Sequence, residues 1–135
     1  MPTWKEDPLT PHQRAAIDRE KHDLFLGLVA RDTVVVMIDP RLPSVQGVPD
    51  DLRRGPTLRL NFSMAFQGAD LSIDDLAVRQ TITLATGQKS RVTVPWSAIY
   101  AMSPMRDIQS TMWEVDAPSE VRCIPILPKD EGSVN

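Results

Sequence analysis

The hydrophobic and polar positions of the chain follow a helical period first and a β period afterwards. Apolar residues recur at helical spacing between residues 11 and 30, which predicts an amphipathic helix packed on one side against a core. Thr10, Pro11 and Gln13 are typical of a helix start, as a cap, a first-turn proline and the partner of a capping box. The predicted apolar face consists of Ile17, Leu24, Phe25 and Leu28, and the predicted solvent face of Arg14, Asp18, Arg19 and Lys21.

From residue 33 onward, the pattern changes to short segments typical of β-strands. The segment TVVVMID at 33–39 is β-branched and apolar, which predicts a strand buried on both faces. The segment TLRLNFS at 57–63 alternates, so its leucines and phenylalanine face one way and Arg59 and Asn61 the other. Further strands are predicted at 69–75, 78–86, 89–96, 98–102 and 111–115, with a hairpin turn at Gly87-Gln88 and one helical turn at 49–53.

One helix followed by about five to seven short strands is typical of a small antiparallel barrel or sandwich. The sequence therefore predicts a mainly β, α+β domain with an N-terminal helix and a small antiparallel barrel. Residues 1–9 are expected to form a disordered leader and residues 10–116 the folded domain. Residues 117–135 contain three prolines and are expected to form a flexible tail.

Composition narrows the class of protein. The 135 residues carry a net charge of −3 and a pI of about 5.3, which argues against nucleic acid as a partner, because phosphates attract a basic face. No apolar run approaches the roughly 20 residues that span a bilayer, and the N-terminus lacks a signal-peptide core. The single cysteine, Cys123, cannot form an internal disulfide. A cytoplasmic location and no membrane contact are therefore expected.

The sequence shows no constellation typical of catalysis. His12 and His22 are ten residues apart, which is not metal-ligand spacing, and Cys123 has no histidine beside it. Asp74 and Asp75 are adjacent on a predicted strand, so they point to opposite faces. No glycine-rich phosphate cradle is present. We therefore expect a protein that is not an enzyme and uses no metal or cofactor.

Four features occur in order along the chain: the first helix; the strand VVVMID, which ends in an acid; the segment LPSVQGVPDDLR followed by LRLNFS; and the pair VPWSAIYAM and TMWE. These features are similar, in the same order, to parts of the SspB family. The helix and the acid-ended strand resemble the first two elements of that family, and LPSVQGVPDDLR and LRLNFS resemble its PGVxVP segment and its VLN strand. The last pair resembles its VP-x-AA strand and its GTMF ending. Members of that family are adaptors that tether degradation-tagged proteins to the ClpXP protease. The resemblance covers roughly residues 10–116.

The resemblance implies an Sm-like or SH3-like barrel that binds an ssrA-type degradation tag, extended, in a surface groove. It also implies a homodimer formed through the N-terminal helix and a C-terminal segment that docks on the ClpX unfoldase. The candidate docking residues in VRCIPILPK are Val121, Ile124, Ile126, Leu127 and Lys129. The implied partners are tagged proteins and ClpX.

Recognition of an extended peptide uses main-chain hydrogen bonds and a few apolar anchors. Thr81 and Thr83 point away from the predicted core, and an asparagine at 61 can both donate to and accept from a peptide backbone. Methionines repack around different ligands, and Met112 matches the methionine of the GTMF ending. The predicted peptide-binding residues are Asn61, Thr81, Thr83, Trp96, Met102, Met112 and Trp113. The pattern leaves open whether Trp96, Tyr100 and Met102 belong to the core or to the groove.

Two other functions remain open from the sequence. Sm-like barrels often bind RNA, so an Sm-like RNA-binding barrel is the alternative function, and it predicts salt-sensitive binding to single-stranded RNA. A small ligand-binding or enzymatic domain is the third class, and a deep pocket that contains His22 or paired acids would support it.

Overall fold

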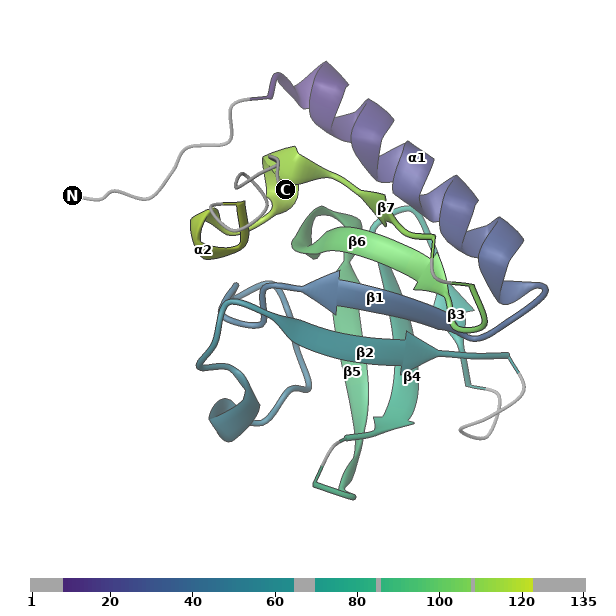
Figure 1. Ribbon diagram of the computed structural model, residues 1–135, viewed down its shortest axis with the longest axis vertical. Helices are drawn as coiled ribbons and strands as arrows, with labels where there is room; N and C mark the ends of the chain where they lie inside the picture. Colours follow the sequence, from purple (N-terminus) through teal and green to yellow (C-terminus); the bar gives the residue numbers. More distant parts are fainter. Residues whose placement is uncertain (1–8, 65–69, 85, 108, 123–135) are drawn as a thin grey trace, which may run out of the picture.

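The structure, a computed structural model, describes residues 9–64, 70–84, 86–107 and 109–122. Within these residues, the chain forms one long N-terminal helix, α1 (Pro11–Val29), and two antiparallel β-sheets (Figure 1). The prediction of an α+β domain that begins with a helix is therefore confirmed. The hydrogen-bonded strands of the described part form two separate sheets and no closed barrel.

Helix α1 begins where its local sequence predicts. The side chain of Thr10 accepts a hydrogen bond from the Gln13 N–H at 3.1 Å, and the Gln13 side chain accepts one from the Thr10 N–H at 3.0 Å. These two bonds are the predicted capping box, which satisfies two main-chain donors of the first turn. On the predicted apolar face, Phe25 and Leu28 are buried, and Ile17 and Leu24 pack against the same core.

The prediction that Lys21 faces solvent is wrong, because its side chain is 0% exposed. Its ammonium donates three hydrogen bonds, to the carbonyl oxygens of Trp96 (2.8 Å) and Ile99 (2.6 Å) and to the Asp116 carboxylate (2.5 Å). These acceptors satisfy all three donors of the ammonium group. Burial lowers the pKa of Lys21, while the charge of Asp116 opposes that shift. The partners lie at least 75 residues away in the sequence, so no local pattern indicates them.

The first sheet has the strand order β2-β1-β6-β7, and all its pairs are antiparallel. Its strands are β1 (Val34–Ile38), β2 (Leu58–Phe62), β6 (Ile99–Pro104) and β7 (Thr111–Met112). In the central register, Val36 of β1 lies opposite Leu60 of β2 on one side and Met102 of β6 on the other. The strand β2 therefore lies at one edge of this sheet.

The second sheet has the strand order β3-β4-β5. Its strands are β3 (Ser72–Ile73), β4 (Ala77–Thr83) and β5 (Lys89–Pro95). The predicted strand at 69–75 is reduced to the two residues of β3, whereas the hairpin turn at Gly87 is present, with a φ of 89°. After Pro95, the 3-10 turn η3 (Trp96–Ala98) leads directly into β6, so this corner carries the chain from one sheet to the other.

The core lies between the two sheets and is closed on one side by α1 (Figure 1). Phe25 of the helix makes edge-to-face contacts with Phe62 and Trp96 at centroid distances of 5.8 and 5.6 Å. The strand 34–38 is almost wholly buried, as its apolar sequence predicts. Val94 and Ile99, on either side of the corner, are both 0% exposed. The apolar segment VPWSAIYAM at 94–102, which contains this corner, therefore belongs mainly to the core.

The proline-rich connection at 40–56 is held against β5. Gln46 exchanges two main-chain hydrogen bonds with Thr93, at 3.0 and 2.9 Å. The guanidinium of Arg53 donates to the carbonyl oxygens of Val45 (2.8 Å) and Leu42 (2.9 Å). The predicted helical turn is present as the 3-10 turn η1 (Asp50–Leu52). These bonds fix the position of η1 beside β2.

The packed part of the chain extends beyond residue 116, where the sequence placed the start of a flexible tail. Ala117 is 0% exposed, and the short helix α2 (Ser119–Arg122) follows the 3-10 turn η4 (Glu114–Asp116). Val121 lies on α2 and is partly exposed. The other predicted docking residues, Ile124, Ile126, Leu127 and Lys129, and the leader up to residue 8 lie outside the described residues.

The attachment of α2 is expected to weaken in acid. Glu120 forms an ion pair with Arg41 at 2.7 Å, and hydrogen bonds from Arg41 lower the pKa of Glu120 from 4.5 to about 2. A carboxyl group with a lowered pKa stabilises the folded form above its unfolded pKa, and this stabilisation is lost as the pH falls through the folded pKa. The Glu120 carboxyl signal, followed by NMR, should therefore titrate near pH 2. Titration near 4.5 in the wild type, as expected for an Arg41→Gln control, would contradict the ion pair.

None of the helices in the described part of the chain combines the length and the apolar character of a bilayer-spanning segment.

Candidate peptide-binding groove

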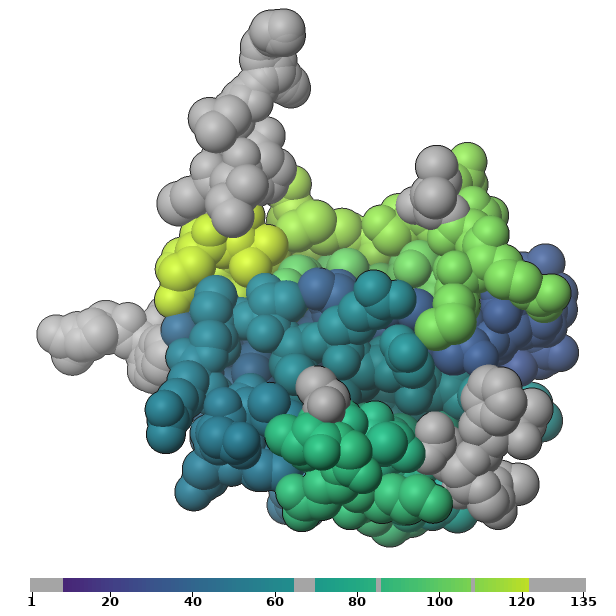
Figure 2. Space-filling view, turned by 60° about the horizontal axis from the view of Figure 1, so that its bottom comes forward, coloured from purple at the N-terminus to yellow at the C-terminus, as the bar shows by residue number. Residues whose placement is uncertain are grey.

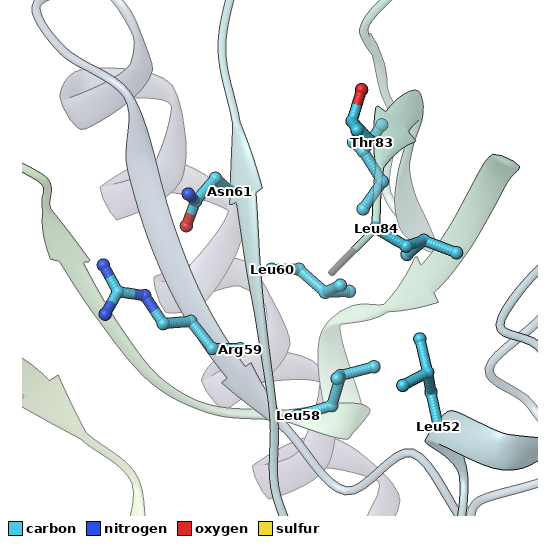
Figure 3. Close-up of a pocket in the computed structure, with 8 residues that line it drawn as sticks. Leu52, Leu58, Arg59, Leu60, Asn61, Thr83 and Leu84 are labelled. Carbon is cyan, nitrogen blue, oxygen red and sulfur yellow. The ribbon is translucent and has the colours of Figure 1, made fainter. Parts of the chain in front are cut away.

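A groove of about 290 Å³ lies between β2 and the end of β4 (Figure 3). In the space-filling view, the teal surface of η1 and β2 adjoins the green surface of the β4–β5 turn on one face of the molecule (Figure 2). The residues that line the groove are Leu52, Leu58, Arg59, Leu60, Asn61, Ile82, Thr83 and Leu84. We call this feature the leucine groove.

The floor of the leucine groove is apolar. Leu58 and Leu60 extend from β2 into the same hollow as Leu52 of η1 and Leu84, which follows β4 (Figure 3). Leu60 and Leu84 are buried, whereas Leu52 and Leu58 are partly exposed. The alternation of β2 directs its two leucines into the groove. The connection at 40–56, which is hydrogen-bonded to β5, places η1 on the side of the groove opposite β2. The groove can therefore receive an apolar side chain.

Arg59 and Asn61 line the groove with their main chain. Their side chains point to the opposite side of β2 from the leucines (Figure 3). Directly after β2, the N–H and C=O of Ser63 both bond to the side chain of Gln80 on β4, at 3.0 and 2.6 Å. Main-chain groups of alternate strand residues point to the same edge. The N–H and C=O groups of Asn61 and Arg59 therefore face the same side as those of Ser63, toward the groove.

The end of β4, beyond the two residues that pair with β3, presents a second edge to the same groove. The N–H of Thr81 donates to Asp70 at 3.0 Å, and its hydroxyl donates to the other carboxylate oxygen at 2.6 Å. Hydrogen bonds from Thr81 lower the pKa of Asp70, which also pairs with Arg91 at 2.8 Å. Thr83, two residues further along β4, faces the same edge as Thr81 by alternation and lines the groove. Two strand edges therefore flank one apolar floor.

The structure brings together two of the residues predicted from the sequence, Asn61 and Thr83, although Asn61 contributes its main chain rather than its side chain. Thr81 lies next to them on β4, but its hydroxyl is engaged by Asp70.

Trp96 and Met102 were predicted to contact a peptide, and this prediction is wrong for their side chains. Both are only 1% exposed and belong to the core. The indole N–H of Trp96 donates to the carbonyl oxygen of Asp74 at 2.9 Å. Tyr100 is buried as well, with its hydroxyl 2.6 Å from that of Thr57. The question that the sequence left open for these three residues is therefore answered in favour of the core.

Met112 and Trp113 lie away from the leucine groove. Met112 is 38% exposed on β7, opposite Ala101, and Ala101 lines a second hollow of about 440 Å³ on the four-stranded sheet. Trp113 is 8% exposed, and its indole N–H donates to Glu20 of α1 at 3.1 Å. Trp113 therefore fastens the end of the domain to the helix, whereas Met112 remains accessible on a different surface.

The sequence interpretation missed the leucines of the groove. The alternation of TLRLNFS correctly places Leu58 and Leu60 on one face of β2, but no binding role was predicted for them. The signal that distinguishes a groove from a core is the separation of the β2 and β4 edges, which lies in the tertiary structure alone. Leu52 gave no signal beyond its place in a predicted helical turn.

The fold and the groove define a small α+β domain that offers two strand edges around an apolar floor. A scan of the chain against protein-family models finds no matching family, and a search of curated proteins finds no matching sequence. Within the described residues, no three side chains of His, Cys, Asp or Glu are arranged to hold one metal ion.

Proposed function

We propose that this chain binds an extended peptide in the leucine groove, as an additional strand on the outer edge of β2. The observation that carries the proposal is the coincidence of that edge with an apolar floor: by alternation from Ser63, Asn61 and Arg59 direct main-chain groups to the hollow that Leu58 and Leu60 line. Among the described strands, none pairs with β2 on the side away from β1. Strand addition supplies affinity through main-chain bonds and specificity through pockets for alternate side chains.

The proposed biological role is that of an SspB-like adaptor, which binds ssrA-type degradation tags and tethers their bearers to ClpXP. The resemblance of the sequence to that family supports this role, and so does the position of the groove between two sheets. A strand bound between the edges of β2 and β4 would connect the sheets. The Sm-like or SH3-like barrel that the resemblance implies is therefore proposed as the arrangement of the occupied domain.

The tether and the dimer belong to the same proposal. The segment after α2, with Ile124, Ile126, Leu127 and Lys129, would dock on ClpX. A homodimer through α1 would use the side of the helix that faces away from the core, where Leu26 is 42% exposed. Sedimentation that finds only monomers at micromolar concentration would remove the dimer from the proposal.

The groove is tested by the pair Asn61→Pro and Asn61→Ala, with titration of a fluorescent ssrA-type tag peptide. Proline removes the N–H that faces the groove, and edge strands tolerate proline where no ladder bond is lost. We expect Asn61→Pro to weaken binding by about 0.5–1.5 kcal/mol, roughly 2- to 10-fold, through one lost hydrogen bond. Asn61→Ala should bind like the wild type, because the side chain points away from the groove.

Two results would contradict this site. Equal affinity of the folded Asn61→Pro variant and the wild type would show that the outer edge of β2 is not used. A loss of affinity in Met112→Glu but not in Asn61→Pro would indicate that the peptide binds at the second hollow, beside which Met112 lies.

The tether is tested by removal of residues 123–135, which spares the buried Ala117 and the ion pair between Glu120 and Arg41. We expect unchanged affinity for the tag peptide and loss of enhanced degradation by ClpXP at low substrate concentration. A tether supplies an effective concentration in the mM range, on the order of that for short flexible linkers, and the truncation abolishes it. Undiminished delivery by the truncated chain would contradict the tethering role.

The alternative of an RNA-binding barrel finds little support in the described residues. Single-stranded nucleic acids stack on exposed aromatic rings along a basic groove. The aromatic residues that the structure describes, Phe25, Phe62, Trp96, Tyr100 and Trp113, are all at most 8% exposed. The peptide proposal is therefore preferred, and salt-sensitive binding to single-stranded RNA would reverse that preference.

A further inference from the structure

A fully buried glutamine joins the two sheets at one end of the leucine groove. Gln80 of β4 is 0% exposed. Its side-chain oxygen accepts a hydrogen bond from the N–H of Ser63 at 3.0 Å, and its side-chain NH₂ donates to the C=O of Ser63 at 2.6 Å. The side-chain amide of Gln80 thus bonds to both main-chain groups of the residue that follows β2.

This arrangement has the hydrogen-bond pattern of a strand pair. In an antiparallel ladder, two opposite residues of a hydrogen-bonded pair exchange both N–H···O bonds through their main chains. Gln80 offers the same donor and acceptor from its side chain. It therefore takes the place of one residue of a partner strand on the outer edge of β2.

The position of Gln80 in its own strand indicates that a glutamine is needed there for these two hydrogen bonds. The neighbours two residues away on the inward face of β4 are Val78 and Ile82, both buried and apolar. An apolar side chain at position 80 would continue that row, and no polar group would then have to leave water on folding. A buried amide costs free energy unless it is hydrogen-bonded, and the Gln80 side chain uses both its oxygen and its NH₂ to bond to Ser63.

We infer that Gln80 is the register stop of the groove: it occupies the last position on the outer edge of β2 and so fixes where a bound strand ends. This inference rests on the proposed peptide binding. With Ser63 taken by Gln80, the main-chain groups that remain for a ligand are those of Asn61 and Arg59, two residues apart on the same edge. A bound peptide pairs through two of its own residues, also two apart.

The register stop also defines the ligand class. Side chains directly opposite each other on paired strands lie on the same face. The ligand residue between the two pairing positions lies opposite Leu60, so its side chain enters the leucine groove. Its two neighbours point to the solvent side with Asn61 and Arg59. The groove is therefore built for a short extended segment with one apolar residue between two solvent-facing ones.

The first experiment uses hydrogen exchange of the full wild-type chain, free and saturated with an ssrA-type tag peptide. In the free chain, the Ser63 amide should exchange more slowly than the amides of Asn61 and Arg59, because Gln80 accepts its hydrogen bond. On binding, the amides of Asn61 and Arg59 should slow and that of Ser63 should stay unchanged. A further slowing of Ser63 alone among the three would overturn the register stop.

The second experiment scans the tag peptide by N-methylation of one main-chain nitrogen at a time. In the wild type, methylation should weaken binding by about 2- to 10-fold at pairing positions only, through single lost hydrogen bonds. Gln80→Met keeps a similar volume and removes the amide, so one additional sensitive position should appear at the Ser63 end of the peptide. The matched control is Gln88→Met, an exposed glutamine in the β4–β5 turn, which should keep the wild-type scan.

The outcomes separate the inference from the proposed function. No binding of the tag peptide by the wild type overturns the peptide proposal and the register stop with it. Binding with an identical scan in the folded Gln80→Met variant overturns the register stop alone. If Gln80→Met does not fold, the exchange rates of Ser63, Asn61 and Arg59 in the wild type decide the question.

Discussion

Replacement of Asp116 by alanine is expected to destabilise the domain by about 3–5 kcal/mol, the cost of breaking a buried ion pair on one side. The Asp116 carboxylate, whose side chain is only 5% exposed, receives the ammonium of Lys21 at 2.5 Å and the guanidinium of Arg14 at 2.6 Å. Without the Asp116 carboxylate, the fully buried ammonium of Lys21 either stays charged with only two carbonyl oxygens as partners or loses a proton, and both states are unfavourable. Urea denaturation followed by circular dichroism measures the change in the free energy of unfolding.

Two further variants attribute the effect to the buried charge. Glu114→Ala removes an exposed carboxylate from the same 3-10 turn and should change the free energy of unfolding by less than about 0.5 kcal/mol. Lys21→Met added to Asp116→Ala should recover part of the loss, because the uncompensated ammonium is gone, and the double-mutant cycle measures the coupling. If Asp116→Ala costs no more than Glu114→Ala, the ion pair does not hold η4 to α1.

Gly47→Ala is expected to lower the free energy of unfolding by about 3 kcal/mol and to weaken the proposed peptide binding as well. Gly47 has a φ of +88°, and an added Cβ would lie 2.1 Å from the main-chain oxygen of Arg91. Left-handed strain of about 1–2 kcal/mol adds to overpacking of about 1–3 kcal/mol. Relief of the contact would pull the connection at 40–56 off β5, break the bonds between Gln46 and Thr93 and displace Leu52 from the groove.

Gly87→Ala is the matched control for this substitution. Gly87 has nearly the same φ, +89°, but no atom lies within 4 Å of its added Cβ. It should therefore cost only the strain, about 1–2 kcal/mol, and leave affinity for the tag peptide unchanged. Equal destabilisation by the two variants in thermal unfolding would mean that the close approach of Gly47 to Arg91 is absent in solution.

Much of the candidate site was within reach of the sequence, and one part of it was not. The alternation of LRLNFS places Leu58 and Leu60 on one face of β2 and Asn61 on the other, as the structure has them. The same alternation cannot tell an edge strand from a central one, so it assigned the function of Asn61 to its side chain. Whether β2 is an edge strand depends on its pairing partners, and these come from elsewhere in the chain.

The aromatic and methionine positions illustrate the opposite failure. Trp96 and Met102 have the chemistry of binding residues, but chemistry does not determine exposure. Trp96 is buried because α1 folds back over the corner after Pro95 and brings Phe25 against its ring. Met102 is buried because it lies on the inward face of β6, opposite Val36 of the central strand.

The sequence by itself determined the features whose interactions span a few residues. These are the start of α1 at its capping box, the periods of helix and strand and the turn at Gly87, because hydrogen bonds and backbone preferences act there between near neighbours. The tertiary structure alone decided the burial of Lys21, the attachment of residues 117–122, the amide of Gln80 against Ser63 and the groove between β2 and β4. Each of these depends on atoms brought together from separate segments of the chain, so its free energy appears only when the sheets and the helix have packed.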